Sequence, residues 1–336
     1  MTDLQLTLAC GRYDRTAFLF DGSIKPEGIT LNCVAKRPGE LFRRMAQSRD
    51  YAVAEMSFST YANLLSRGDR GLVGIPVFTS RVFRHSYVFV NRGAGIETAG
   101  DLAGKRVGTM QYQLTSNLWM RGILEDDYGV RPADFTWYFG GQDSPGHGER
   151  AAVAIPDDIE SVAIPDDQTL DRLLVAGDID ALLAPHIPAS FRAQNPNVRR
   201  LFEDYREVEA AYHRRTGFFP IMHLVVIRRD VYERDPWVAE SLFDAFRRAK
   251  HAALERLQFT GTLAAMVPWL FGELEAAEAV FAGHYWPYGV AENRSELETM
   301  LAWAQRHGIT VRPLEVDELF APGTLDLACG ADQSGD

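Results

Sequence analysis

The chain has 336 residues, of which 46% are hydrophobic, and its formal net charge at pH 7 is −11. A chain of this length can bury a large core, and we expect more than one domain. An acidic chain without a basic stripe or tail is not typical of a nucleic-acid-binding protein. No segment approaches the ~18 consecutive apolar residues of a membrane-spanning helix, so we expect neither a nucleic-acid nor a membrane partner.

The start of the chain and its cysteines indicate a reducing compartment. Residues 1–8 alternate in polarity like a strand and lack the basic start and long apolar stretch of a secretory signal. Cys10, Cys33 and Cys329 show no metal-binding or redox spacing, and an odd cysteine count fits a reducing environment. We therefore predict a cytoplasmic protein.

Short apolar segments alternate with amphipathic ones along the chain, which predicts α/β layers. Strands are expected at residues 4–9, 29–34, 51–56, 72–78, 85–90, 106–110, 181–184 and 219–227. Helices are expected at residues 38–47, 58–65, 115–128, 169–176, 240–257 and in a segment that ends near 307. Ser57 is expected to cap the second of these helices, and Thr115 or Ser116 the third.

Other segments have compositions that argue against long regular elements. Glycine and proline dominate residues 140–150, which predicts a loop. The sequence VAIPDD occurs at 153–158 and again at 162–167. Two copies are too few for a solenoid, so we expect short surface strands or turns. Residues 326–336 are expected to form a flexible tail.

This order of elements predicts two α/β lobes with mixed sheets and a cleft between them. Lobe 1 is expected to contain residues 1–83 and 222–325, and lobe 2 residues 84–221. The segments at 84–90 and 219–227 are expected to cross between the lobes. In such an arrangement a ligand binds in the cleft, at strand ends and helix starts.

The segment at residues 77–86 places two arginines and a histidine in an otherwise apolar, strand-like run. If the segment is extended, Arg81, Phe83 and His85 share one face and Arg84 lies on the other. A guanidinium grips a carboxylate with two parallel hydrogen bonds. The alternative is an internal salt bridge, but arginine and histidine together on one face favour an anion site.

A carboxylate at the end of an apolar strand is unexpected for burial, and Glu55 occupies such a position. It is expected to be either a general acid or base with a raised pKa, or the partner of Arg81. Ser57, two residues later, either caps the next helix or donates a hydrogen bond to a ligand.

Two further segments offer groups that would suit a ligand. The turn after the first strand contains Arg12, Tyr13 and Asp14, and α/β proteins bind ligands at strand ends. A solvated turn is the alternative. The aromatic segment at 284–289, with Trp286, either walls a cleft around a planar ligand or packs in the core.

The segment at 108–116 joins a strand to a helix. The free N–H groups of a helix start suit a carboxylate, which makes Gln113 and Thr115 candidates for binding. The glycine content is too low for a phosphate loop, so a nucleotide is not expected. Arg121, one to two turns into the helix, either reaches the cleft or lies on the surface, and a surface arginine is the commoner outcome.

His223 lies in the strand expected at 219–227, where it shares a face with Ile221 and Val225. A core histidine with satisfied hydrogen bonds is the default interpretation. His223 becomes a candidate because it falls in the second crossing segment, where it would face His85.

The chain lacks GxSxG, HExxH, CxxC, a P-loop and GxGxxG after a strand, so hydrolase, nucleotide and structural-zinc functions have no specific support. Glu55, His85, His223 and Asp14 form a set that would suit a divalent metal, but their spacing is non-local. We expect no required cofactor, with a divalent metal as the alternative.

Several segments resemble one known family. They are VAEMS at 53–57, IPVFTSRVFRHS at 75–86, YQLT at 112–115, WMRGIL at 119–124 and TGFFPIMH at 216–223. The chain resembles the 4,5-dihydroxyphthalate decarboxylases from residue 1 to about 325. Members of this family have a fold like the type 2 periplasmic binding proteins. The repeat at 153–167 has no counterpart in the resemblance.

The resemblance implies conversion of the aromatic dicarboxylate 4,5-dihydroxyphthalate to protocatechuate and CO2, and a homo-oligomer. Arg81 and the helix start at Thr115 would hold carboxylate, and His85 or His223 would donate the proton to the ring. Glu55 or Asp14 would orient the histidine or accept the phenol proton. Replacing His85 by glutamine is expected to reduce turnover far more than binding. The other residues expected to contact substrate are Arg12, Tyr13, Ser57, Arg84, Gln113 and Trp286.

Three other functions stay open on the sequence. The chain would be a solute-binding protein that captures an aromatic acid without changing it, a decarboxylase of a related aromatic or heteroaromatic diacid, or a cytoplasmic ligand sensor. No DNA-binding helix pair supports the sensor. Product formation separates a binding protein from an enzyme.

Overall fold

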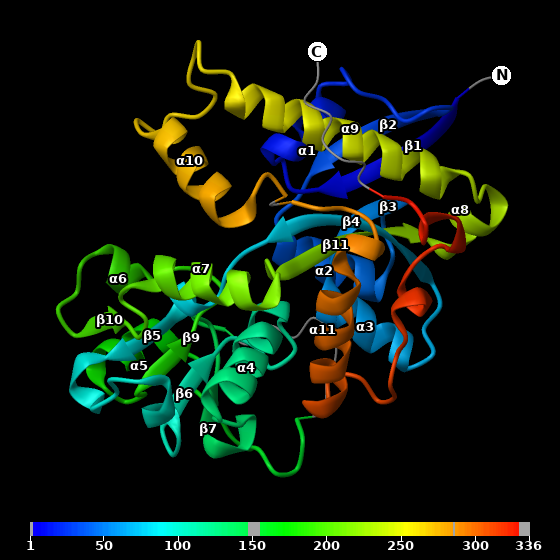
Figure 1. Ribbon diagram of the computed structural model, residues 1–336. Helices are drawn as coiled ribbons and strands as arrows, with labels where there is room; N and C mark the ends of the chain where they lie inside the picture. The colour runs from blue at the N-terminus through cyan, green and yellow to red at the C-terminus, as the bar shows by residue number, and fades with distance from the viewer. Residues whose placement is uncertain (1–2, 147–154, 285, 329–336) are drawn as a thin grey trace. The chain divides into compact units, whose positions relative to one another are not determined.

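The computed structural model describes residues 3–146, 155–284 and 286–328 (Figure 1). The chain divides into two compact units. Unit 1 comprises Met1–Arg81, Ile221–Glu298 and Leu314–Asp336, and unit 2 comprises Val82–Pro220 and Thr299–Pro313. The sequence analysis placed residues 299–313 in lobe 1, whereas these residues belong to unit 2. The expected tail at 326–336 lies outside the described residues from 329 onward.

The described part of unit 1 contains a five-stranded mixed sheet in the order β2-β1-β3-β11-β4. Its strands are β1 (Leu4–Cys10), β2 (Ile29–Ala35), β3 (Val53–Ser57), β4 (Leu72–Arg81) and β11 (Ile221–Arg228). β1 runs parallel to β2 and β3, while β11 runs antiparallel to β3 and β4. All of β3 is buried, as expected for a central strand covered on both faces.

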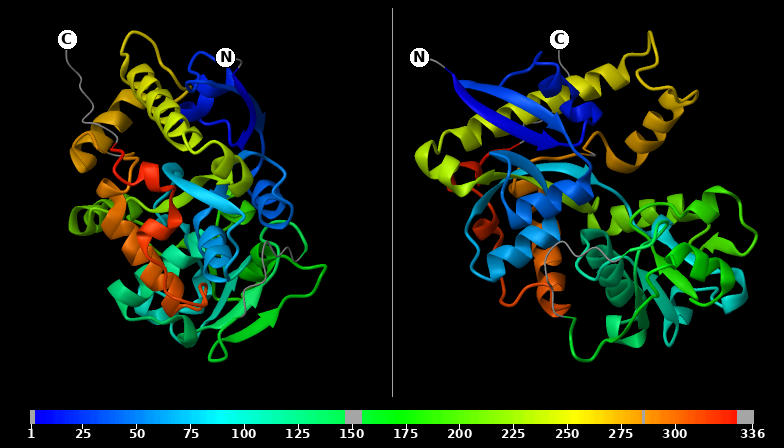
Figure 2. Two further views of the ribbon diagram at one scale, coloured as in Figure 1. Left: turned by 90° about the vertical axis from the view of Figure 1, so that its right-hand side faces the viewer. Right: turned by 180° about the vertical axis from the view of Figure 1, so that it is seen from behind.

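Helices of unit 1 pack on this sheet (Figures 1 and 2). They are α1 (Asp14–Phe20), α2 (Pro38–Gln47), α3 (Phe58–Ser66), α8 (Arg229–Arg234) and α9 (Val238–Gln258), and α10 (Leu270–Phe281) also belongs to unit 1. α11 (Arg294–Arg306) begins in unit 1 and ends in unit 2. α9 packs against α1 and buries the stripe that its sequence predicts, including Leu242, Phe243 and Phe246.

The described part of unit 2 contains a six-stranded mixed sheet in the order β10-β5-β9-β6-β7-β8. Its strands are β5 (Val88–Asn91), β6 (Arg106–Thr109), β7 (Thr136–Phe139), β8 (Glu160–Ala163), β9 (Ala181–Leu183) and β10 (Val198–Arg200). Its helices are α4 (Thr115–Tyr128), α5 (Leu170–Ala176), α6 (Ala189–Arg192) and α7 (Tyr205–Thr216). Phe89, Leu174 and Leu182 belong to its buried core.

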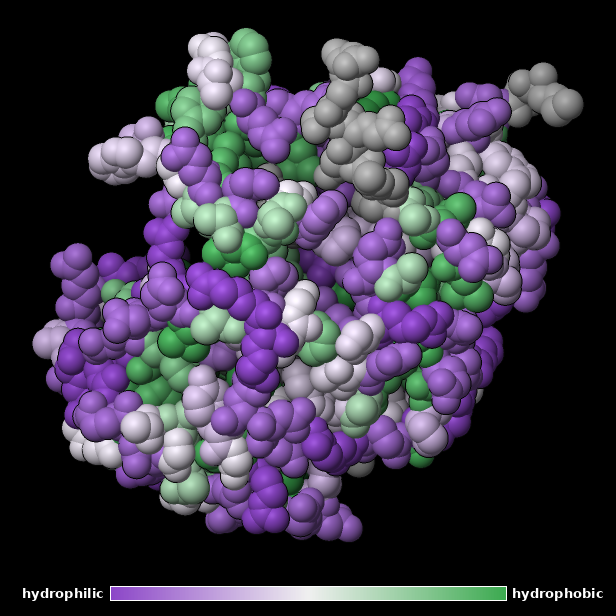
Figure 3. Space-filling model, in the orientation of Figure 1, coloured by the Kyte–Doolittle hydropathy of each residue, from purple (hydrophilic) through white to green (hydrophobic). Residues whose placement is uncertain are grey.

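Short 3₁₀ helices complete the described elements. They are η1 (His85–Tyr87), η2 (Arg92–Ala94), η3 (Ala99–Leu102), η4 (Pro132–Asp134), η5 (Ala291–Asn293), η6 (Val316–Leu319) and η7 (Pro322–Thr324). Within the described residues, no helix is both long and apolar enough to cross a membrane. Hydrophilic residues cover most of the face shown in Figure 3.

The structure corrects the strand expected at 85–90. β4 ends at Arg81, and His85 begins the 3₁₀ helix η1 before β5 starts at Val88. Arg84 has φ −124° and ψ −12°, which is not an extended conformation. The expected common strand face of Arg81, Phe83 and His85 is therefore wrong, because the alternation of side chains stops where the strand ends.

Two expected helix caps also differ from the structure. α4 takes Leu114 as its N-cap residue rather than Thr115 or Ser116. Ser57 does hold the N-cap position of α3, but its side chain makes no capping hydrogen bond. The second VAIPDD copy forms the end of β8 and a turn, while residues 153 and 154 of the first copy lie outside the described residues.

Candidate active site

A buried carboxylate lies at the centre of the unit 1 sheet. Glu55 on β3 is fully buried and accepts three sets of hydrogen bonds. The Gly11 backbone N–H lies 2.8 Å from Oε2, and the Tyr13 hydroxyl lies 2.9 Å from Oε1 and 3.2 Å from Oε2. His223 on β11 places Nδ1 2.7 Å from Oε1. The parallel strands β1 and β3 and the antiparallel β11 bring these residues together because they are adjacent in the sheet.

The charge of Glu55 sets the protonation of its partners. Burial alone would raise the pKa of Glu55, but the hydrogen bond and charge of His223, with the Gly11 and Tyr13 donors, hold that pKa below its ordinary value. The raised pKa expected for Glu55 is therefore wrong in direction. An ionised carboxylate only accepts hydrogen bonds, so Nδ1 of His223 carries a proton. The other ring nitrogen, Nε2, is the one left for proton exchange.

His223 is the partly exposed member of this group. Its side chain is 17% exposed, whereas that of Glu55 is 0% exposed. The edge of its ring meets Phe42 of α2, with the centroids 4.7 Å apart. Burial and the neighbouring carboxylate raise the pKa of Tyr13 well above its ordinary value, so Tyr13 stays neutral as a donor. The resulting assembly is a carboxylate that fixes an accessible imidazole.

A stacked arginine adjoins the same tyrosine. The Arg15 guanidinium lies 4.3 Å from the ring centroid of Tyr13 and 4.2 Å from that of Trp286. Its Nε donates to the Thr79 carbonyl at 2.7 Å, and its Nη1 pairs with the exposed Asp14 at 3.0 Å. The two aromatic rings hold the cation in a fixed plane, the geometry that suits a carboxylate.

Arg81 is engaged elsewhere in unit 1. Its side chain is 1% exposed, and its Nη1 lies 3.2 Å from Glu296 Oε2. Its Nη2 donates to the Pro287 carbonyl at 3.0 Å and to Asn293. Arg81 therefore forms the internal salt bridge that was the alternative to an anion site, and Glu296, not Glu55, is its carboxylate partner.

Replacing Arg81 by methionine is expected to destabilise the protein by about 3–5 kcal/mol, because Glu296 would be left as a buried, uncompensated charge. Urea unfolding of the purified variant measures the loss. The matched control is Arg43→Met, which removes an exposed arginine of α2 and should change little. An Arg81→Met variant as stable as the wild type would contradict a structural role for this pair.

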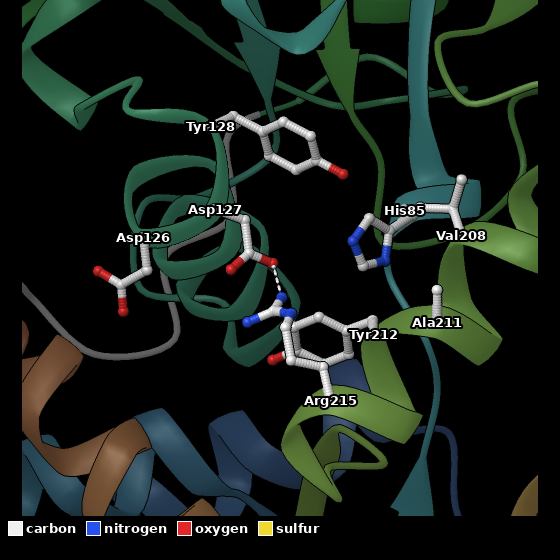
Figure 4. A pocket seen from close by; sticks show the side chains of 8 residues that line it. All are labelled: His85, Asp126, Asp127, Tyr128, Val208, Ala211, Tyr212 and Arg215. Carbon is white, nitrogen blue, oxygen red and sulfur yellow. Dashed lines mark hydrogen bonds and ion pairs between the residues drawn. The ribbon is translucent and has the colours of Figure 1, made fainter.

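His85 lines a pocket of unit 2 (Figure 4). The pocket has a volume of about 590 Å³ and is lined by His85, Asp126, Asp127, Tyr128, Val208, Ala211, Tyr212 and Arg215. The His85 ring is nearly buried, and its centroid lies 6.5 Å from that of Tyr128 and 5.3 Å from that of Tyr212. Arg215 is paired with Asp127 at 2.5 Å, so this cation is already compensated.

The remaining candidates of unit 2 lie apart from this pocket. Gln113 and Thr115 are buried near the start of α4. His85 instead lies beside Tyr128, which is the last residue of α4. A helix of 14 residues is about 20 Å long, so the structure does not bring His85 and Thr115 into one site.

Two buried arginines of unit 2 also have protein partners. Arg84 is 6% exposed and donates to the Pro185 carbonyl at 3.3 Å, and burial lowers its pKa to about 10. The surface position expected for Arg121 is wrong, because this residue is fully buried. Its guanidinium lies 3.8 Å from the Tyr112 ring centroid and donates to the Tyr112 carbonyl at 2.7 Å.

His85 should make the folded protein less stable as the pH falls. Burial and the nearby Arg215 lower the pKa of His85 to about 4 from an ordinary 6.5. Below pH 6.5 the unfolded chain binds a proton that the folded chain does not, so folding loses about 2 kcal/mol at pH 5. His85→Gln removes this group. Its urea midpoint should fall less than that of the wild type between pH 7 and pH 5, and equal falls would contradict the assignment.

The structure therefore connects Tyr13, Glu55, His223 and Trp286, with Arg15 as an additional member. Arg15 was not among the expected site residues, although it belongs to the turn that supplied Arg12, Tyr13 and Asp14. Its role depends on stacking against Trp286, which is 271 residues away, so only the presence of a second cation in the turn signalled it. Arg12 is exposed, and Ser57 is buried with its Oγ 3.3 Å from that of Ser59.

The expected metal set is not assembled as a group. Glu55 and His223 contact each other, but Asp14 is exposed and pairs with Arg15. Among the residues that the structure describes, no three or more His, Cys, Asp or Glu side chains lie close enough to hold one metal ion.

No family model matches this chain. A 4,5-dihydroxyphthalate decarboxylase of Comamonas testosteroni is 36% identical over 326 residues, which cover 97% of this chain and 99% of the relative. This chain belongs to the 4,5-dihydroxyphthalate decarboxylase family. A second member, from Pseudomonas putida, is 34% identical over 218 residues, 65% of this chain and 84% of the relative. The predicted family and the predicted enzyme class, a carboxy-lyase, are confirmed.

Solved structures with a similar fold were found for this chain. The periplasmic sulfonate-binding protein SsuA of Methylobacillus flagellatus has a TM-score of 0.59 at 14% identity, covering 96% of this chain and 93% of its own. SsuA of Escherichia coli has a TM-score of 0.54 at 11% identity, covering 96% of this chain and 99% of its own. The predicted periplasmic-binding-protein-like fold is confirmed, and at these identities the likeness concerns the fold alone.

Proposed function

We propose that this protein converts 4,5-dihydroxyphthalate to protocatechuate and CO2. The observation that carries the proposal is the Glu55–His223 pair, a buried carboxylate fixing a partly exposed imidazole, in a chain of this family. Decarboxylation of an electron-rich ring needs a cation for the spared carboxylate, an acceptor for a phenol proton and an acid that protonates the ring carbon. Three residues can fill these roles: His223 of the pair, and Asp14 and Arg15, which follow Tyr13 in the sequence.

We assign to Arg15 the binding of the carboxylate that stays on the ring. Of its donors, Nε bonds to the Thr79 carbonyl and Nη1 to Asp14, while Nη2 has no hydrogen bond among the described residues. Tyr13 and Trp286 fix the guanidinium plane and offer flat surfaces for an aromatic ring. This assignment replaces Arg81, whose guanidinium is already paired with Glu296.

We assign to His223 the role of donating a proton to the ring carbon. The leaving carboxylate is para to a hydroxyl, and loss of that hydroxyl's proton directs electron density to the carbon that bears the carboxylate. Protonated His223 gives its Nε2 proton to this carbon, forming a C–H bond. Glu55 stabilises the imidazolium before transfer, which makes Glu55 a positioning residue.

The acceptor of the phenol proton is assigned to Asp14, an exposed carboxylate beside Arg15. When the bond to the departing carboxylate breaks, its electron pair restores the aromatic ring and returns negative charge to the phenol oxygen. Asp14 then returns the proton to this oxygen, and His223 regains one from solvent. The net reaction consumes one proton and releases one CO2, so no oxidant or reductant is needed.

We further propose that no metal is required, because these residues can perform each proton transfer and the electron pair of the broken C–C bond is taken up by the ring. We also propose a cytoplasmic location, which the free thiols of Cys10 and Cys33 support, and a homo-oligomeric state. Fractionation of the native cells tests the location, and recovery of the protein only from the periplasm would contradict it.

Incubating the protein with 4,5-dihydroxyphthalate, after a chelator has removed loosely bound metal, tests the function. We expect protocatechuate and CO2 in equal amounts. Chromatography measures the protocatechuate, and trapping measures the CO2. Phthalate is the matched control, because it carries both carboxylates but no hydroxyl to supply electron density, and it should not react. Binding of 4,5-dihydroxyphthalate without product, with or without added divalent metal, would contradict the proposal and favour a solute-binding protein.

A further inference from the structure

One segment of unit 1 exposes large apolar side chains. The connection between α9 and α10 exposes Phe259, Leu263, Met266, Val267 and Trp269, by 62%, 49%, 102%, 43% and 78% respectively. Figure 3 shows hydrophobic residues over this connection and α10 at the upper left of the view. We call these five residues together with α10 the α10 surface. Leu270 is the buried residue of α10.

The five apolar residues of the connection are 43% to 102% exposed, so the described part of unit 1 does not cover them. At about 150–250 Å² for a large apolar side chain, the exposed fractions of the five residues amount to roughly 700 Å². A typical soluble monomer has no apolar patch larger than about 300–600 Å². A standard protein interface buries about 800 Å² on each partner, so the α10 surface is the size of one half of a contact.

The charges beside the apolar residues are complementary to each other. α10 carries Glu273, Glu275 and Glu278 and no cation. In the last part of α9, Arg247 and Arg248 pair with Asp244 and Lys250 is buried, whereas Arg256 is exposed. In a contact with two-fold symmetry the same surface meets itself, so Arg256 of each copy would meet the acidic α10 of the other. This charge pattern also disfavours a membrane surface, which attracts cations and repels an acidic helix.

We propose that the α10 surface is the contact between two copies of this chain. This inference names a surface that the proposed function does not specify, and it does not depend on the catalytic assignment. The apolar connection forms the centre of the contact, with Trp269 and Met266 as its main anchors, because large aromatic and flexible side chains dominate such contacts. The α9 and α10 charges of the two copies fix its orientation.

Light scattering of purified protein at micromolar concentration tests the proposal without substrate. The wild type should have the mass of two chains or an even multiple. The variant Met266→Ser with Trp269→Ser should have half that mass, with dissociation constants raised by roughly 100-fold or more. Circular dichroism checks that the variant is folded. The matched control, Val311→Ser, removes another apolar side chain that is 57% exposed and should keep the wild-type mass.

A charge exchange tests the orientation of the contact. Glu275→Arg with Glu278→Arg in one preparation, and Arg256→Glu in another, should each weaken association. A mixture of the two should associate more strongly than either alone, because each half of the mixed contact then pairs opposite charges. A mixture that does not associate would overturn the pairing of α10 with α9.

Several results would overturn the contact itself. They are a monomeric wild type, an apolar variant with unchanged mass, and a control that dissociates like the variant. Flotation with vesicles of phosphatidylcholine and phosphatidylglycerol that requires Met266 and Trp269, together with a monomeric wild type, would assign the surface to a membrane instead. Product formation from 4,5-dihydroxyphthalate, measured on the same samples, reports separately on the proposed function.

Discussion

Replacing His223 by glutamine is expected to lower kcat by about 10²- to 10⁴-fold, the usual contribution of a positioned general acid. Glutamine keeps a hydrogen-bonding group beside Glu55 but cannot transfer a proton to a ring carbon. Substrate binding should change little, because the spared carboxylate is assigned to Arg15. Steady-state rates with 4,5-dihydroxyphthalate and calorimetry of its binding separate the two effects.

The same substitution at two other histidines provides the comparison for this result. His284→Gln, at an exposed position, is the matched control and should keep the wild-type kcat. His85→Gln should reduce kcat by less than about tenfold, since burial holds the pKa of His85 near 4 and its ring is neutral at pH 7. A larger loss at His85 than at His223 would assign proton transfer to the unit 2 pocket and contradict the account.

Replacing Arg15 by methionine is expected to raise KM for 4,5-dihydroxyphthalate by roughly 10- to 100-fold, the effect of losing hydrogen bonds to a charged group. Methionine retains an apolar chain between Tyr13 and Trp286, so the local packing should survive. Arg15→Lys should recover only part of the loss, because an ammonium lacks the planar fork of a guanidinium. Kinetics over a range of substrate concentrations measure both variants.

The control for Arg15 is Arg43→Met, which removes one exposed cation from α2 of the same unit. It separates the loss of a specific carboxylate contact from the loss of one positive charge on an acidic protein. A KM that rises equally in both variants would mean that Arg15 acts only through long-range charge. An unchanged KM in Arg15→Met would remove Arg15 from substrate binding.

Hydrophobic periodicity was sufficient for most of the fold. The helix expected at 38–47 matches α2, and the helix expected at 115–128 matches α4, because apolar side chains recur there at helical spacing. The strand expected at 85–90 was wrong in its first half, since η1 contains apolar and polar residues in an order that a short strand would also show. Short apolar runs do not distinguish such elements.

Part of the candidate site was also readable from the sequence. Glu55 stood out as a carboxylate in an apolar strand, and His223 as a histidine in another. Their contact was one of several pairings that the family resemblance left open, and the sequence pattern could not select it, because it depends on β11 pairing with β3 across 168 residues of sequence. The partner of Arg81 was missed for the same reason, since Glu296 is 215 residues away. Sequence spacing reports neighbours on one element, not contacts between distant ones.

The most direct test of the central claim is decarboxylation in D2O, followed by proton NMR of the product. We expect the wild type to release protocatechuate with one deuterium on the carbon that carried the lost carboxylate, because His223 exchanges its proton with solvent before transfer. His223→Gln should form this product at least 100-fold more slowly. Unchanged substrate after prolonged incubation of the wild type, or equal rates in both proteins, would contradict the account.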